Sequence, residues 1–165
     1  MKKIALLVFF LSICVVLVFG QNSGSEKTEG LVLTSAFIGV GPEANLSTRN
    51  GPAFGGFLNA GFEFGERFAV GIRAAFGHDF NTVASLETAL LLRYYLPLGG
   101  LSDLFAEINA GIKCYFEFEE AFPAPLISIG LGYVFKFGDR FYVEPLVRAG
   151  HPFTFGASLG LGILF

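Results

Sequence analysis

The residues in this sequence best suited to chemistry are two histidines, one cysteine and a set of paired acids and bases. His78 and His151 are the only histidines. His78 ends one predicted β-strand and His151 follows another, at the same end of a predicted ring of eight strands. Their two strands are four positions apart in that ring, so the histidines should lie on opposite walls. This placement argues against a shared metal site and against a catalytic pair of histidines.

The cysteines do not indicate a disulfide framework. Cys14 lies in an N-terminal apolar segment that we expect to be removed, so Cys114 has no partner for an internal disulfide. Cys114 falls on the apolar face of its predicted strand. We therefore interpret it as a small lipid-facing residue and not as a nucleophile.

Charged residues recur on one face of the predicted strands, opposite the apolar face. The set is Glu63, Glu87, Glu107, Glu117 and Glu144 with Arg73, Arg93, Lys113, Lys136 and Arg148. A charge facing lipid at mid-depth would cost roughly 2–4 kcal/mol, so these residues should face a lumen, and there they should pair with one another. Two interpretations remain open: an ion-pair plug that fills a narrow lumen, which we favour, and a polar conduit gated by the same pairs.

The strand that best shows this two-faced pattern is the last one, predicted over Phe153–Phe165. Its odd positions are all apolar, and its even positions are Thr, Gly or Ser except for Leu164. Side chains of a strand alternate between two faces, so one face is apolar and the other is made of small groups. Small groups suit the crowded interior of a narrow barrel. The segment also exceeds the roughly 9–11 residues that a tilted strand needs to cross a bilayer.

The same period of two predicts eight strands joined by short connections. The predicted strands are 30–40, 52–64, 68–78, 82–96, 105–117, 126–137, 141–149 and 153–165. We expect Gly41–Gly51 and Phe118–Pro125 to be loops, and a bulge at Pro145 because proline removes a ladder hydrogen bond. Two turns share a Gly-acid-Arg pattern between phenylalanines, at Gly65 and at Gly138. The predicted fold class is all-β, an eight-stranded antiparallel up-and-down transmembrane β-barrel.

The N-terminus has the pattern of a secretory signal peptide. Lys2 and Lys3 precede the apolar segment Ile4–Phe19, which predicts a signal peptide over residues 1–20, cleaved after Gly20; an uncleaved membrane anchor is the alternative. Residues 21–29 would be a polar periplasmic lead-in and residues 30–165 the outer-membrane barrel.

The composition excludes other classes of protein. Hydrophobic residues make up 53% of the chain, yet no apolar run after the signal peptide is long enough for a helical span. This combination is typical of a membrane β-barrel, whose apolar residues come at alternate positions. The net charge of −3 and the lack of a Lys/Arg cluster argue against nucleic-acid binding.

The C-terminal strand resembles the assembly signal of bacterial outer-membrane β-barrels, carried here by Leu159, Leu161, Ile163 and the terminal Phe165. The whole mature chain is similar to the small eight-stranded barrels of the OmpA transmembrane domain, OmpX and OmpW type. The resemblance implies a monomer in the cell outer membrane with both termini periplasmic, contacts with outer-membrane lipids, and recognition by the barrel-assembly machinery during biogenesis. It implies no cofactor and no metal. The short predicted loops depart from OmpX-like adhesins, whose extended strands make a protruding edge.

Several functions are compatible with this architecture. We favour a structural or surface-exposed barrel that makes its contacts through the two predicted loops; the alternative is an OmpW-like channel for small or apolar molecules. Lipid A deacylases of this size carry a His-x-Ser pair, whereas the histidines here are followed by Asp79-Phe80 and Pro152-Phe153, so we predict no enzymatic activity. A soluble lipid-binding barrel such as a lipocalin is the competing fold, with the apolar faces inward and the charges outward.

Overall fold

A computed structural model of the chain describes residues 32–47, 51–65, 67–79, 83–97, 102–117 and 120–165. The predicted signal peptide and periplasmic lead-in lie outside the described residues. No helix within the described ranges is long and apolar enough to cross a membrane.

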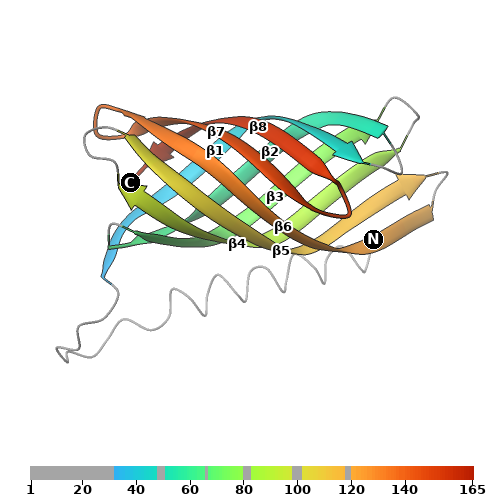
Figure 1. The fold of residues 1–165 in the computed structure, drawn as a ribbon, viewed down its shortest axis with the longest axis horizontal. Helices are drawn as coiled ribbons and strands as arrows, with labels where there is room; N and C mark the ends of the chain where they lie inside the picture. Colours follow the sequence, from blue (N-terminus) through green and yellow to red (C-terminus); the bar gives the residue numbers. More distant parts are fainter. Residues whose placement is uncertain (1–31, 48–50, 66, 80–82, 98–101, 118–119) are drawn as a thin grey trace. The chain divides into compact units, whose positions relative to one another are not determined.

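Eight antiparallel strands form a closed barrel in chain order, which confirms the predicted fold class (Figure 1). They are β1 (Leu33–Ser47), β2 (Gly51–Phe64), β3 (Phe68–Asp79), β4 (Ala84–Pro97), β5 (Ser102–Glu117), β6 (Glu120–Phe137), β7 (Phe141–His151) and β8 (Phe155–Leu164). Each strand pairs with its sequence neighbours, and β1 pairs with β8 to close the ring. Closure satisfies the hydrogen-bonding groups that an open sheet edge would leave unpaired.

Alternation along each strand separates an apolar outer face from a lumenal face. The adjacent residues Leu90 and Leu91 show it most clearly: the first is 67% exposed and the second 1%. Large exposed apolar side chains occur on all eight strands, while the buried set contains arginines, glutamates and asparagines. This arrangement is the reverse of a lipocalin-like soluble barrel and excludes that competing fold.

The glycines of the two Gly-acid-Arg turns have nearly the same φ. Gly65 and Gly138 have φ values of 61° and 63°, a region that residues with a Cβ rarely adopt. The carbonyl of Arg67 accepts a hydrogen bond from Tyr95 N, and the carbonyl of Arg140 accepts one from Leu164 N, each at 2.7 Å. In both turns, therefore, the arginine carbonyl accepts a hydrogen bond from a backbone N–H of another strand.

The predicted loop Gly41–Gly51 is wrong, because β1 continues to Ser47. Pro42 stays paired with Gly56 of β2, and the ladder to β8 is interrupted only between Val40 and Glu43. The register of β1 against β8 is the same on both sides of that gap. A proline in the wall thus removes one donor without ending the strand.

The predicted loop Phe118–Pro125 is also wrong, because β6 begins at Glu120. Its first residues pair with β5, from Glu117↔Glu120 onward, whereas its pairing with β7 begins only at Ile127. The β5–β6 hairpin therefore extends past β7, which corrects the expectation that the strands make no protruding edge. Pro123 and Pro125 lie in this one-sided segment, as expected for prolines at an edge.

Two further details of the last strands differ from the predictions. The register between β6 and β7 is unchanged across Pro145, so this proline interrupts the ladder but makes no bulge. β8 begins at Phe155, and Phe153, predicted to face outward, is buried at 2% exposure. Phe153 belongs to the bend before the strand, so the period of two does not reach it.

Candidate functional site: the ion-pair network in the lumen

Eight charged side chains fill the middle of the lumen, and none is more than 5% exposed. They form two groups, which we name by their place along the barrel axis. The distal cluster lies toward the β1–β2 and β3–β4 connections and contains Glu43, Arg73, Glu87, Lys113 and Arg148. The proximal cluster lies toward the start of β1 and the end of β8 and contains Arg93, Glu107 and Glu144.

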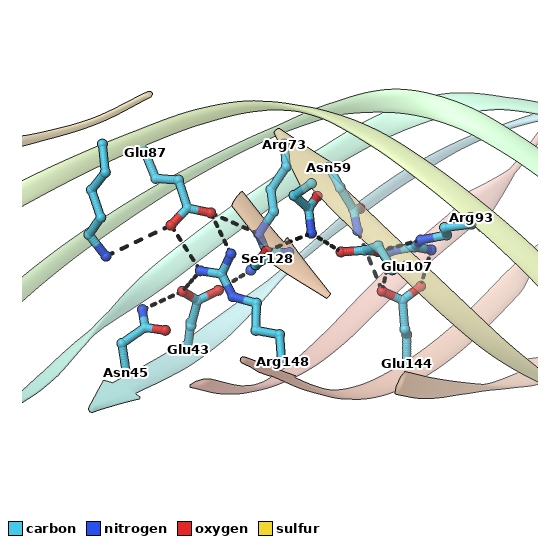
Figure 2. A network of polar contacts seen from close by, with 12 residues as sticks. Glu43, Asn45, Asn59, Arg73, Glu87, Arg93, Glu107, Ser128, Glu144 and Arg148 are labelled. Carbon is cyan, nitrogen blue, oxygen red and sulfur yellow. Dashed lines mark hydrogen bonds and ion pairs between the residues drawn. The ribbon is translucent and has the colours of Figure 1, made fainter. Parts of the chain in front are cut away.

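The distal cluster is organised around the guanidinium of Arg148 (Figure 2). Its Nη1 lies 2.5 Å from Glu87 Oε1, and its Nη2 lies 2.6 Å from Glu43 Oε1. Arg73 pairs with Glu43 and, through Nε at 3.6 Å, with Glu87. Each carboxylate is thus shared between two arginines, an arrangement that satisfies more lone pairs than a single pair could.

The proximal cluster has one cation between two acids. Arg93 Nε lies 2.6 Å from Glu107 Oε2, and its Nη1 and Nη2 bind the two oxygens of Glu144 at 2.6 and 2.7 Å. Glu107 also accepts a hydrogen bond of 2.7 Å from Asn109. Charge-assisted and bidentate contacts of this kind are the strongest hydrogen bonds available to side chains.

Aromatic rings and glycines complete the filling. The guanidinium of Arg73 lies 4.2 Å from the ring centroid of Phe57, and that of Arg93 lies 4.5 Å from Phe105. The ring of Phe105 occupies the space that a side chain at Gly132 would need. Small residues on the lumenal face therefore make room for the large ones opposite them.

Two small cavities lie at the ends of the network. The distal cavity has a volume of about 20 Å³ and is bordered by Asn45, Asp79, Ser85, Lys113 and Phe153, among others. The proximal cavity, of about 10 Å³, is bordered by Arg93 and Glu144. Each has room for about one water molecule, and the charged network occupies the space between them.

The structure places seven of the ten predicted lumenal charges in these clusters. They are Arg73, Glu87, Arg93, Glu107, Lys113, Glu144 and Arg148. Lys136 lies apart, one third exposed, and pairs with Asp103 at 3.0 Å. Glu63 is half-buried and accepts a hydrogen bond from Ser35. The side chain of Glu117 lies outside the described residues.

Sequence reasoning missed Glu43, which bridges both arginines of the distal cluster. Gly41 and Pro42 led us to place it in a loop. The available signal was the alternation itself, because Gly39, Gly41, Glu43 and Asn45 continue the lumenal face of β1 at every second position.

The residues considered for other chemistry lie apart from the network. His78 and His151 are exposed at the ends of β3 and β7, which are not neighbours in the barrel. Cys114 is a free thiol of intermediate exposure in β5. Within the described ranges, no group of three His, Cys, Asp or Glu side chains is placed to hold a metal ion.

No protein-family model and no curated protein matches this sequence. Solved structures do match in fold. The N-terminal β-barrel domain of Pseudomonas aeruginosa OprF has a TM-score of 0.61 at 15% identity, over 79% of this chain and 97% of its own. Outer membrane protein OprG from the same organism has a TM-score of 0.61 at 11% identity, over 84% and 99%.

A third similar structure is Ail, the attachment invasion locus protein of Yersinia pestis, in complex with the heparin analogue sucrose octasulfate. Its TM-score is 0.56 at 14% identity, over 79% of this chain and 98% of its own. At these identities the similarity concerns the fold, and it agrees with the closed eight-stranded ring and the apolar outer face. This chain has the fold of the small eight-stranded outer-membrane β-barrels, the group that its sequence resembles.

Proposed function

We propose that this protein is an integral outer-membrane β-barrel with a closed lumen, and that its role is structural or surface-exposed. The apolar outer face supports residence in a bilayer, because the eight charged side chains of the two clusters, which lipid would exclude, are buried in the lumen. The outer-membrane location is supported by the predicted signal peptide over residues 1–20 and by the outer-membrane proteins that share the fold.

The observation that carries the closed lumen is the ion network. Four acids and four bases cross the lumen at no more than 5% exposure each, and Arg93 bridges β4 to β7 on the facing wall. An ion passing through would have to displace a buried pair, and breaking such a pair costs about 3–5 kcal/mol. The resting barrel should therefore exclude ions, and its contacts should be made at its ends.

Conductance in planar lipid bilayers tests this proposal. Protein isolated from the membranes of cells that express the full chain should give no reproducible current steps. Arg93→Ala and Glu107→Ala should also give no current steps, because aromatic side chains still fill the lumen. Reproducible steps in the unaltered protein, changed in size by either substitution, would contradict the closed lumen.

The second candidate function is a narrow channel for small molecules, and the cavities at both ends of the network favour it. The distal cavity reaches Lys113 and the proximal cavity reaches Arg93 and Glu144. A continuous path would require the charged network between the two cavities to rearrange. Current steps that appear only above a threshold voltage and that change in Arg93→Ala would favour the channel over the closed lumen.

We also propose that the C-terminal strand is read by the barrel-assembly machinery. Leu159, Leu161, Ile163 and Phe165 all lie on the outer face, where a membrane-embedded partner could contact them before closure of the barrel. Phe165 is the most exposed of the four, at 71%.

A further inference from the structure

The β7–β8 hairpin is joined to the rest of the wall by two ladders, and each ladder has a gap at a proline (Figure 1). Pro42 lies in the gap of the β1–β8 ladder, and Pro145 lies in the gap of the β6–β7 ladder. Within the described residues, the four ladders from β2–β3 to β5–β6 have no such gap. Both proline gaps therefore border the same hairpin.

The two gaps lie at the same level of the wall. The register of β1 against β8 places Leu159 opposite Pro42, and the register of β7 against β8 pairs Leu159 with Pro145. Each proline keeps its pairing with the strand on its other side, so the nitrogen that cannot donate faces the gap. We name this row of three residues, Pro42, Leu159 and Pro145, the crease.

Small residues and one buried acid lie on the lumenal side of the crease. Gly41 and Gly160 are next to it in β1 and β8, and a Cβ on Gly41 would collide with the carbonyl oxygen of Leu159. Glu144 precedes Pro145 in β7 and is 1% exposed. Backbone and not packed side chains therefore separates the outer face from the lumen at this level.

Ion pairs across the lumen attach the hairpin to the opposite wall (Figure 2). Glu144 lies 2.6 Å from Arg93 of β4, and Arg148 lies 2.5 Å from Glu87 of the same strand. Both charges of β7 are thus held by β4. These contacts stabilise the hairpin where its own ladders lack donors.

We propose that the β7–β8 hairpin is the part of the wall that opens, that it hinges at the crease, and that Glu144 and Arg148 latch it to β4. Local opening begins where the fewest backbone hydrogen bonds must be broken. In lipid this preference is stronger, because a newly broken backbone hydrogen bond finds no water to replace it. Opening at the crease would expose the lumen sideways and is a different motion from passage along the axis.

Amide hydrogen exchange of the full-length protein in lipid nanodiscs, followed by nuclear magnetic resonance, tests the hinge without a variant. The amides of residues 143–147 and 157–161 flank the crease, and those of 70–74 and 88–92 lie on the uninterrupted β3–β4 ladder. We expect the first group to exchange about two- to tenfold faster, as one missing hydrogen bond predicts. Equal rates in the two groups would overturn the proposal.

Proline substitutions show whether the missing donors cause the opening. Pro42→Val and Pro145→Val each restore one N–H, so each should slow exchange in the hairpin by about two- to tenfold. Pro123→Val is the matched control, because Pro123 pairs only with β5 and a new N–H there would meet no strand. All three changes loosen the unfolded chain alike. No slowing in the first two variants, or equal slowing in the control, would overturn the hinge.

Glu144→Gln tests the latch, because it removes the charge that Arg93 binds and keeps the shape of the side chain. Exchange should become faster in the β7–β8 hairpin and stay unchanged in the β3–β4 ladder. A purely structural role would accelerate exchange in both. That result, or an unchanged rate in the hairpin, would overturn the latch.

Discussion

Arg93 is the only cation of the proximal cluster, so its removal is the most informative single change. Arg93→Met takes away the contact of 2.6 Å to Glu107 and the two contacts of 2.6 and 2.7 Å to Glu144. It leaves two carboxylates, each 1% exposed, without a compensating charge. Removing one partner of a buried pair costs about 3–5 kcal/mol, because the remaining charge is desolvated and unpaired. We expect a loss of this size in the free energy of unfolding.

The assay is urea unfolding in lipid vesicles. The folded fraction is measured on gels, where the folded barrel of an unheated sample migrates faster than the unfolded chain. Lys136→Met is the control, because its partly exposed pair with Asp103 should contribute only about 0–1 kcal/mol. A triple variant, Arg93→Met with Glu107→Gln and Glu144→Gln, should recover at least half of the loss. It removes the stranded charges but keeps acceptors for Asn109 and Asn59.

Two results would refute this reasoning. If Arg93→Met costs no more than the exposed control, the network does not stabilise the barrel. If the triple variant is as unstable as the single one, the loss comes from packing around Arg93 and not from unpaired carboxylates.

Three other changes test the packing, the lipid face and the C-terminus. Gly132→Ala should destabilise the barrel by about 1–3 kcal/mol because its Cβ would meet the ring of Phe105. The lipid-facing control Ala106→Val should change the free energy of unfolding by no more than about 0.5 kcal/mol in the same urea assay. An equal cost for both variants would contradict the close packing. Ile129→Arg places a charge near the middle of β6 on the lipid face, so it should cost about 2–4 kcal/mol in vesicles, and a neutral effect would count against lipid contact there. Phe165→Ala keeps both backbone hydrogen bonds of residue 165, so the unfolding midpoint should stay unchanged. Assembly should become slower, as measured by protease protection in membranes that contain the assembly machinery. An unchanged assembly rate would show that Phe165 is not part of the assembly signal.

The two faces of each strand could be predicted because they follow from local periodicity. Leu90 and Leu91 are identical in type, yet their positions in the alternation correctly place one outside and one inside. The same reasoning fails at Phe153, where the strand has not yet begun. Periodicity holds only within an element, and it does not mark where the element begins.

Prolines caused the other errors, because their effect depends on neighbours that the sequence does not show. Pro42 and Pro123 each suggested a loop, yet both lie in strands. A proline is tolerated where its nitrogen faces a gap in the ladder, and the position of such a gap depends on the stagger of the whole ring. Mistaking Pro42 for a loop residue also removed Glu43 from the expected network.

The partners of the lumenal charges could be predicted only in part. Arg93 lies directly opposite Glu107 on the neighbouring strand, a contact that follows from the antiparallel register. Its bidentate contact with Glu144 crosses the lumen from β4 to β7 and depends on the radius and stagger of the closed barrel. Composition thus indicates that the charges pair, while the three-dimensional fold decides which pairs form.

The central claim is that the apolar outer face meets lipid while the lumen is packed with buried side chains. Nuclear Overhauser contacts between side-chain methyl groups and lipid acyl chains, measured in lipid nanodiscs, test it without altering the protein. Leu90, Ile129 and Leu161 should show contacts with acyl chains, and Leu91, Leu126 and Leu146, which are buried in the lumen, should show none. Acyl-chain contacts to the second group and not to the first would contradict the account.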